Sequence, residues 1–288
     1  MIKIEFLHYY INHIIMMQQT TGLKRKTTDK YYTSNKAVKE CMKLVNEKIK
    51  IKVEDLCVEP SAGNGSFIES IKSMFTNYKF YDLEPDNTEI IKQDYLTFDY
   101  SELHTEGKIH IIGNPPFGRQ SSFAIKFIKK SCEFANTISF ILPKSFKKNS
   151  LQKCFPLNFH LETEYDLPND SFVVDDKIYN VPCVFQIWIK KDTHRPKPIK
   201  QFPDKYQFVK KDIEHDISFR RVGINAGDID RITEQKSEQS HYFIKFDNVL
   251  TDDLFDNLAN INYSCKDNTV GPRSISKQEL MKEFNIFT

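Results

Sequence analysis

The chain contains no apolar run long enough to cross a membrane. Its N-terminal stretch, residues 1–19, is apolar and aromatic but is interrupted by Lys3, Glu5 and His8. That stretch is too short and too polar for a transmembrane helix, and no small-residue cleavage site of a signal peptide comes after it. We therefore expect a cytoplasmic protein without a membrane partner, in which residues 1–19 form an N-terminal extension.

The composition also lacks paired cysteines and a strong excess of one charge. The six cysteines show no spacing typical of a metal site, and several lie in apolar runs. We therefore expect reduced, mostly buried thiols and no bound metal. The net charge of +2 neither requires nor excludes a nucleic-acid partner, so local clusters of basic residues must decide that question.

The most informative segment is Asn114-Pro115-Pro116-Phe117. A short apolar run of strand type precedes it, and two prolines then form a stiff turn with no backbone N–H at either position. The Asn114 side-chain oxygen and the Pro115 carbonyl can converge on one NH₂ group, while Phe117 offers a flat ring beside it. An exocyclic amine on an aromatic base needs such acceptors and a stacking surface. The alternative is an ordinary proline-rich loop at a strand end.

A second informative segment, residues 56–67, lies upstream. Its sequence predicts a buried strand, a turn that contains Gly63 and Gly65, and the start of a helix. Glycines in such a turn permit a ligand to approach the backbone closely, as in nucleotide-binding units. An isolated Gly-x-Gly is weak evidence, so the segment is informative only together with the acidic residues downstream of it.

Acidic residues follow this turn in a regular order. The next predicted strand, 79–82, ends in Asp82, which lies 23 residues after Glu59. That is the usual position of a carboxylate that accepts hydrogen bonds from ribose hydroxyls. Asp94 comes next, followed by apolar residues, and only then Asn114. This order predicts a cofactor site beside the amine site.

Together these segments resemble the S-adenosylmethionine-dependent amino-methyltransferases, especially the adenine-N6 enzymes with an Asn-Pro-Pro-Phe motif. In this chain the cofactor segment precedes the catalytic segment. That order resembles the order in the subclass of these enzymes whose target-recognition region lies at the C-terminus. The resemblance covers residues 28–190. The chain departs from the family in two ways. Glu59-Pro60-Ser61 stands where Asp-Pro-Phe is commoner, and no large recognition domain follows the region of resemblance.

The resemblance implies S-adenosylmethionine as cofactor and assigns roles to the cofactor segment. Gly63 and Gly65 would approach the methionine part, and Asp82, with Glu84 as second choice, would take the ribose hydroxyls. For each acid the alternative is a helix cap or a surface carboxylate. The full implied cofactor set is Tyr32, Thr33, Glu59, Pro60, Ser61, Gly63, Gly65, Phe67, Asp82, Asp94, Tyr95 and Asn114.

The resemblance also implies how the reacting groups are held. Asp94 would accept from the adenine amine of the cofactor, with Tyr95 or Leu96 against its ring. The implied catalytic set is Asn114, Pro115, Pro116 and Phe117, in which Phe117 stacks on the target base. Transfer of an activated methyl group requires that the methyl group and the amine be aligned. It also requires hydrogen-bond acceptors whose bonds to the amine strengthen as the amine gains positive charge.

Basic residues near the motif are candidates for phosphate contacts. Arg119 follows the catalytic segment directly, and three lysines, Lys144, Lys147 and Lys148, follow the next predicted strand. Solvated surface charges are the alternative for all four. Further along, Arg220 and Arg221 are adjacent on a predicted strand and so face opposite sides, which allows at most one of them to reach the substrate.

The alternation of predicted strands and helices indicates an α/β fold. We expect a mostly parallel, doubly wound sheet of the Rossmann-like methyltransferase type, with an antiparallel hairpin from residues 166–191 at one edge. A proline-containing linker, 192–203, precedes a small α+β extension. The predicted domains are therefore an extension at 1–19, a catalytic domain at 20–191, and a C-terminal extension at 192–288 that is a candidate for substrate recognition.

The sequence supports four functional hypotheses. The first is a DNA adenine-N6 methyltransferase, and the second places the same chemistry on RNA, which the small recognition region favours. A third is methylation of a protein glutamine amide, although relatives with that activity usually carry Tyr at the position of Phe117. The fourth is a catalytically silent binding subunit, which loss of Asn114 or of the glycines would indicate; both are present.

Overall fold

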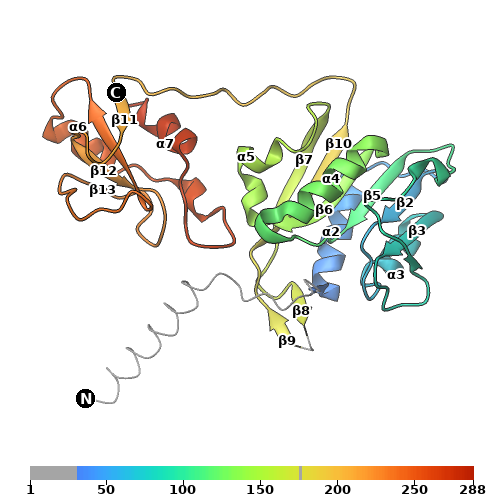
Figure 1. Cartoon of the computed structure of the whole chain (residues 1–288). Coiled ribbons are helices and arrows are strands. Elements are labelled where there is room, and N and C mark those ends of the chain that lie inside the picture. The colour runs from blue at the N-terminus through green and yellow to red at the C-terminus, as the bar shows by residue number, and fades with distance from the viewer. Residues whose placement is uncertain (1–30, 175–176) are drawn as a thin grey trace, which may run out of the picture. The chain divides into compact units, whose positions relative to one another are not determined.

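A computed structural model describes residues 31–174 and 177–288, so the predicted extension at 1–19 lies outside the described residues. The chain divides into two compact units, one that contains residues 31–197 and one that contains residues 198–288. Each unit has its own main sheet (Figure 1). Each also has its own apolar core cluster.

The first unit is built on a seven-stranded sheet with the order β4-β3-β2-β5-β6-β10-β7. Its first five strands are parallel. In chain order these are β2 (Leu56–Glu59), β3 (Asn77–Asp82), β4 (Ile91–Lys92), β5 (Ile109–Gly113) and β6 (Thr137–Pro143). Every residue of β6 is buried, as expected for a central strand covered on both faces. The prediction of a mostly parallel Rossmann-like sheet is confirmed.

The antiparallel edge differs in detail from the predicted hairpin. Strand β10 (Cys183–Lys190) lies between β6 and β7 (Phe159–Asp166) and is antiparallel to both. The hairpin of β8 (Phe172–Val174) and β9 (Lys177–Tyr179) instead pairs with β1 (Tyr32–Thr33) in a separate three-stranded sheet. The reason is that β10 is long and apolar enough to occupy a central position, which leaves the polar β7 at the edge.

Four helices accompany this sheet: α2 (Asn35–Lys48), α3 (Ile68–Met74), α4 (Ser122–Phe134) and the short α5 (Asn149–Gln152). Ser34 is the N-cap of α2, and its hydroxyl accepts from the N–H of Ala37, as its position predicts. Ser121 is the N-cap residue of α4 but makes no side-chain capping bond. Its backbone is left-handed, with φ 63°, unlike the extended backbone of the N-cap residue Ser34.

An apolar core cluster of the first unit includes Tyr95, Phe127, Phe140, Phe155 and Trp188. The rings of Phe155 and Trp188 stack with their centroids 4.0 Å apart. All six cysteines are free, and three of them are fully buried. Within the described residues, no helix is both long and apolar enough to cross a membrane.

The second unit has a four-stranded antiparallel sheet in the order β11-β14-β12-β13. The strands are β11 (Tyr206–Val209), β12 (Ile217–Arg220), β13 (Ile229–Asp230) and β14 (His241–Phe246), and the helices are α6 (Asp252–Ala259) and α7 (Lys277–Phe284). Ser276 and Glu279 form a capping box at the start of α7. The helices and one sheet face enclose a core that includes Phe219, Ile244 and Phe284.

Candidate functional site

A pocket of about 710 Å³ lies at the carboxyl ends of β2, β3 and β5, where ligands bind in open parallel sheets. Its volume falls within the range of sites for cofactors and other small molecules. Residues from both predicted motifs line it. They are Tyr31, Tyr32, Thr33, Glu59, Pro60, Ser61, Gly63, Asn64, Ser66, Phe67, Asp82, Leu83, Glu84, Gln93, Asp94, Tyr95, Leu96, Asn114, Pro115, Pro116, Phe117, Phe123 and Phe127.

The side chain of Asn114 is fixed in orientation by strand β1 and the residue before it. Its Nδ2 group donates to the main-chain oxygen of Tyr31 at 3.1 Å and to the Thr33 hydroxyl at 3.3 Å. Its main-chain oxygen accepts from the Ser61 hydroxyl at 3.2 Å. Its Oδ1 atom is buried and has no hydrogen-bond partner among the described residues. A buried acceptor without a partner carries a desolvation cost, which a ligand that donates to it would remove.

The loop after Asn114 turns sharply before α4 begins. Gly118 has φ +66°, and Gln120 and Ser121 also adopt left-handed backbone conformations, which are uncommon for residues other than glycine. The N–H group of Phe123 returns to the Phe117 carbonyl at 3.1 Å, which places two aromatic residues of the pocket at the start of the helix. The Phe123 side chain is 44% exposed, so its ring is accessible to a substrate.

The glycine turn brings Asp82 against the backbone. The N–H of Gly63 donates to Asp82 Oδ2 at 2.8 Å, and the N–H of Glu84 donates to Oδ1 at 2.8 Å. Gly63 is left-handed, and a Cβ at this position would lie 3.4 Å from the Tyr32 ring. The Tyr32 hydroxyl donates to Asp86 at 2.5 Å, so β1 passes close to this turn. The cofactor loop and the strand that orients Asn114 are therefore neighbours.

Gly65 serves a different purpose from Gly63. It does not line the pocket, and a Cβ there would lie 2.7 Å from Ile68 Cδ1 and 2.9 Å from Asn87 Nδ2. Its φ of +87° is also unfavourable for other residues. The left-handed backbone and the close packing of Ile68 and Asn87 account for the glycine at position 65.

The pocket is acidic. Four carboxyl side chains line it, those of Glu59, Asp82, Glu84 and Asp94, and no Lys or Arg does so within the described part of the chain. Glu59 is fully buried, and its Oε2 atom has no hydrogen-bond partner there. Burial, with the nearby charge of Asp82, raises the pKa of Glu59 to about 8. A cation in this pocket would be stabilised, and it would favour the ionised form of Glu59.

Asp94 and Tyr95 form the far wall of the pocket. The Asp94 Oδ1 atom accepts a hydrogen bond from the N–H of Leu96 at 2.9 Å. This bond closes a turn in which the Asp94 carboxylate lies at the pocket wall. The Tyr95 hydroxyl is hydrogen-bonded to Ser131 at 2.9 Å, and its ring stacks on Phe127 at 5.3 Å. Tyr95 is therefore a rigid wall residue, while Leu96 and Asp94 are the more accessible neighbours.

The structure brings most of the predicted site residues into this pocket. All of the predicted catalytic and cofactor residues except Gly65 line it. The predicted phosphate contacts, Arg119, Lys144, Lys147 and Lys148, do not. Phe123 and Phe127 also line the pocket, although they were not predicted as pocket residues. The spacing of Phe123 and Phe127 predicts only an apolar helix face, and no local signal distinguishes the two roles.

Two of the predicted phosphate-binding lysines are engaged elsewhere. The Lys147 Nζ atom lies 2.8 Å from Asp166 and 3.5 Å from Glu164, both on β7. Lys144 lies 3.7 Å from Asp166. Arg119, in contrast, is exposed in the loop after the motif. No group of three or more metal-binding side chains occurs in residues 31–174 and 177–288.

Part of the chain matches a known family model. Residues 55–197 match the family described as the EDM2 methyltransferase-like domain. The chain is 26% identical over 183 residues to Protein ENHANCED DOWNY MILDEW 2 of Arabidopsis thaliana. That match covers 56% of this chain and 14% of the plant protein, so it spans only a small part of that protein's length.

Several solved structures share part of the fold. A candidate RNA methyltransferase from Pyrococcus horikoshii has a TM-score of 0.46 at 14% identity, over 62% of this chain and 96% of that chain. An rRNA methylase from Streptococcus thermophilus has a TM-score of 0.38 at 14% identity, over 60% of this chain and 100% of that chain. These scores are too low to support a functional argument.

Proposed function

Because residues 55–197 match a methyltransferase-like domain, we propose that this protein is an S-adenosylmethionine-dependent methyltransferase that acts on the exocyclic N6 amine of adenine in nucleic acid. DNA is our first expectation for the substrate and RNA the alternative. S-adenosylmethionine is the cofactor, and its sulfonium supplies a methyl group that is already activated, so the transfer needs no covalent intermediate on the enzyme.

The orientation of Asn114 is the observation that carries this proposal. Both hydrogens of its Nδ2 group are directed to Tyr31 and Thr33, so Oδ1 is left as a buried acceptor in the pocket. An acceptor held in this way suits an NH₂ group and rejects a carbonyl or ether oxygen. As the amine nitrogen gains positive charge, its hydrogen bond to Oδ1 strengthens, which favours the transition state over the ground state.

The pocket fits a cationic cofactor with a nucleoside part. Four carboxyl groups and no basic side chain line it among the described residues, which favours a ligand with a positive charge. Gly63 leaves room for close approach to the backbone, and Asp82 retains acceptor capacity beyond its two backbone bonds. Leu96 and Tyr95 provide apolar contact for a purine ring.

The aromatic residues favour a base over a glutamine amide as the methyl acceptor. Phe117 and Phe123 lie together at the pocket, and Phe123 is exposed. Stacking of a base on an aromatic ring contributes about 1–3 kcal/mol, similar to the few kcal/mol needed to unstack the base. A glutamine side chain has no ring to use this surface. Unpaired bases, in single strands or loops, should therefore be the easier targets.

The experiment that tests the proposal identifies the methylated product directly. The full chain is incubated with isotope-labelled S-adenosylmethionine and with DNA and RNA oligonucleotides of the same sequence. The digested products are then separated by mass. We expect label in N6-methyladenine with the wild-type chain and none with Asn114→Ala. Label in protein glutamine, or no label with any acceptor although the cofactor binds, would refute the proposal.

A further inference from the structure

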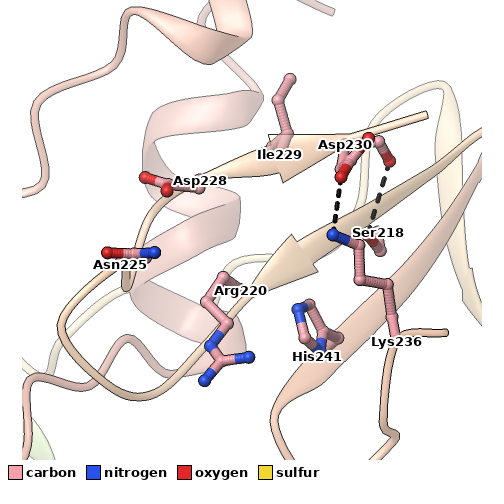
Figure 2. A pocket seen from close by; sticks show the side chains of 8 residues that line it. All are labelled: Ser218, Arg220, Asn225, Asp228, Ile229, Asp230, Lys236 and His241. Carbon is pink, nitrogen blue, oxygen red and sulfur yellow. Dashed lines mark hydrogen bonds and ion pairs between the residues drawn. The ribbon is translucent and has the colours of Figure 1, made fainter. Parts of the chain in front are cut away.

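The second unit has a polar pocket of its own, of about 250 Å³, on the side of the sheet away from its core. Figure 2 shows its lining side chains on β12, β13, β14 and the connecting loops. No aromatic side chain except an imidazole lines it, so it does not offer a stacking surface. The lining residues are Ser218, Arg220, Asn225, Asp228, Ile229, Asp230, Lys236 and His241.

Arg220 is fixed in place but has hydrogen-bonding capacity to spare. Its Nε atom donates to the Val222 carbonyl at 2.8 Å, and its only other side-chain hydrogen bond in the described chain is a long one, 3.5 Å from Nη1 to the Ser240 hydroxyl. No carboxylate forms an ion pair with it within residues 177–288. Gly223, with φ +104°, lets the loop lie against the guanidinium, because a Cβ there would be 3.3 Å from Nη2.

His241 lies beside Arg220 in the same pocket and is only 7% exposed (Figure 2). Its Nδ1 atom is 3.1 Å from the Ser237 carbonyl and 3.0 Å from the Ser240 hydroxyl. Because the carbonyl can only accept, a proton on Nδ1 satisfies it, and Nε2 has no hydrogen-bond partner among the described residues. Burial, with the charges of Arg220 and Lys236, lowers the pKa of His241. An anion beside it would offset those charges and favour a proton on Nε2.

Neither acidic residue of the pocket forms an ion pair with Arg220 in the described part of the chain. Asp230 is paired with Lys236 at 2.6 Å, so these two charges neutralise each other. Asp228 is exposed at the rim, where it can accept a hydrogen bond from a sugar hydroxyl. An unpaired guanidinium with an adjacent imidazole is the combination that binds a tetrahedral oxyanion.

We propose that the pocket around Arg220 is a phosphate-binding site that holds one phosphodiester of the nucleic-acid substrate. That the pocket binds a phosphate group is inferred from its own residues, whereas the nucleic-acid source of that phosphate rests on the proposed function. A contact of this kind positions the strand without reading its sequence. It gives the C-terminal unit a role in substrate binding at a site other than the methyl-transfer pocket.

The neighbouring arginine provides a matched control. Arg221 directs Nε and Nη2 to the Gln239 carbonyl, at 3.1 and 2.8 Å, and lies over the Tyr242 ring at 5.6 Å. It does not line the pocket. Arg220→Gln and Arg221→Gln remove the same charge from adjacent positions, so only a specific site distinguishes them.

The test measures binding of fluorescent DNA and RNA single strands of identical sequence to the full chain as salt increases. We expect Arg220→Gln to weaken binding about tenfold at low salt and to reduce the slope of log affinity against log salt by about 0.7, the value for one phosphate on a single strand. Arg221→Gln should leave the slope unchanged. Equal slopes for the two variants would overturn the proposal.

Two further measurements complete the test. Asp228→Ala removes the acceptor and should weaken RNA alone if Asp228 accepts from the 2′-hydroxyl. An equal response of both strands would assign the site to the phosphate that they share. Inorganic phosphate should shift the His241 ring proton resonance of the wild-type chain, a result that needs no variant. Absence of that shift at saturating phosphate would also overturn the proposal.

The outcomes separate this proposal from the proposed function. If nucleic acid is methylated but Arg220→Gln binds with the wild-type salt slope, the phosphate site fails and the methyltransferase function remains. If no nucleic acid binds but phosphate still shifts the His241 resonance, the anion site remains and the nucleic-acid substrate fails.

Discussion

The Nδ2 group of Asn114 donates to the main-chain oxygen of Tyr31 at 3.1 Å, although 83 residues separate them in the chain. Because a backbone carbonyl can only accept, this contact determines which end of the amide faces the pocket. The short strand β1, which begins at the next residue, therefore controls the chemistry of the catalytic motif. Its pairing with β8 holds it in register, Tyr32 with Val173 and Thr33 with Phe172.

The first prediction concerns Asn114 itself. Asn114→Ala should reduce methyl transfer by a factor of about 10²–10³, the loss typical of removing one transition-state hydrogen-bonding group. Cofactor affinity should stay within a few-fold, because Asn114 acts on the target amine. Single-turnover kinetics and calorimetry measure the two quantities separately.

Thr33→Val is the matched control for that variant. It removes one of the two acceptors of Asn114 Nδ2, the longer one at 3.3 Å, and leaves Oδ1 in place. We expect a much smaller loss of turnover. An Asn114→Ala enzyme that retains more than a tenth of wild-type turnover would contradict the assignment.

The second prediction separates the two glycines of the turn. A Cβ on either costs about 1–2 kcal/mol of backbone strain because both have left-handed conformations. Gly63→Ala should weaken cofactor binding, since Gly63 lines the pocket beside Tyr32. Gly65→Ala should mainly lower the melting temperature, since its Cβ would collide with Ile68. Equal loss of cofactor affinity in the two variants at unchanged stability would refute this division.

The parallel part of the fold was predictable from the sequence because its signals are local. Buried apolar runs marked β2 and β5, and cap residues such as Ser34 and Ser276 marked helix starts. Strand β7 was not predicted, since an edge strand with alternating charges lacks an apolar signature. The order in which strands pair depends on contacts between distant segments, so β10 could not be placed beside β6 from its own sequence.

Only those residues of the site that belong to a sequence motif could be predicted. Asn114 follows strand β5 and Asp82 ends strand β3, so both could be identified from position, and both line the pocket. The Tyr31 contact, which orients Asn114, leaves no mark in the sequence around either residue. Likewise, Lys147 is engaged by acids of the unpredicted strand β7, so its environment could not be foreseen.

The third prediction concerns the buried carboxyl of Glu59. Its pKa of about 8 means that it is protonated near pH 7 in the free protein. A cationic cofactor should displace that proton, so affinity should increase with pH up to about 8 and then level off. Calorimetry at pH 7 in two buffers of different ionisation enthalpy should detect release of close to one proton.

Glu59→Gln is the control for this titration. It should remove both the proton release and the pH dependence of affinity. It should also remove a pH dependence of the folding stability. Between the ordinary pKa of 4.5 and about 8, the folded wild-type chain holds a proton on Glu59 that the unfolded chain has lost, so folding stability decreases as pH increases across that window. Wild-type cofactor affinity that is constant from pH 6 to pH 8 would exclude the proposed role.

The fourth prediction concerns the opposite end of the sheet, where Asp55, His110 and Thr137 form a buried network. His110 Nε2 lies 3.1 Å from Asp55 Oδ2, and Nδ1 lies 2.8 Å from the Thr137 hydroxyl. Burial lowers the pKa of His110 below 6.5, although Asp55 opposes this effect. As pH decreases, His110 therefore takes up a proton in the unfolded chain before it does so in the folded chain. Folding stability should decrease below about pH 6.5 for this reason.

Urea unfolding at pH 7.5 and pH 5.5 measures this effect. Asp55→Ala should lower the free energy of unfolding by about 1–3 kcal/mol or more at both pH values, because the N–H groups of Lys52 and Lys108 also lose their acceptor. Catalytic turnover of the folded fraction should be unaffected. A wild-type stability that does not change between the two pH values would contradict the prediction.

The last prediction separates the basic residues around the catalytic motif. Lys147 is mostly buried and is paired with Asp166 and Glu164, so it stabilises the edge of the sheet and has little freedom to contact phosphate. Lys147→Ala should therefore lower stability and leave the salt slope of nucleic-acid binding unchanged. Arg119 is exposed directly after the motif. Arg119→Gln should leave stability unchanged and reduce that slope by about 0.7 for a single strand.

Each of these two variants acts as the control for the other, because each removes one positive charge from a segment that follows one of the paired parallel strands β5 and β6. Adenine specificity should survive in both, since phosphate contacts carry no information about the base. If Lys147→Ala reduced the slope instead, its ion pairs would have to break on substrate binding. If wild-type binding did not respond to salt at all, the substrate would not be a polyanion, and methylation of a protein glutamine would become the better hypothesis.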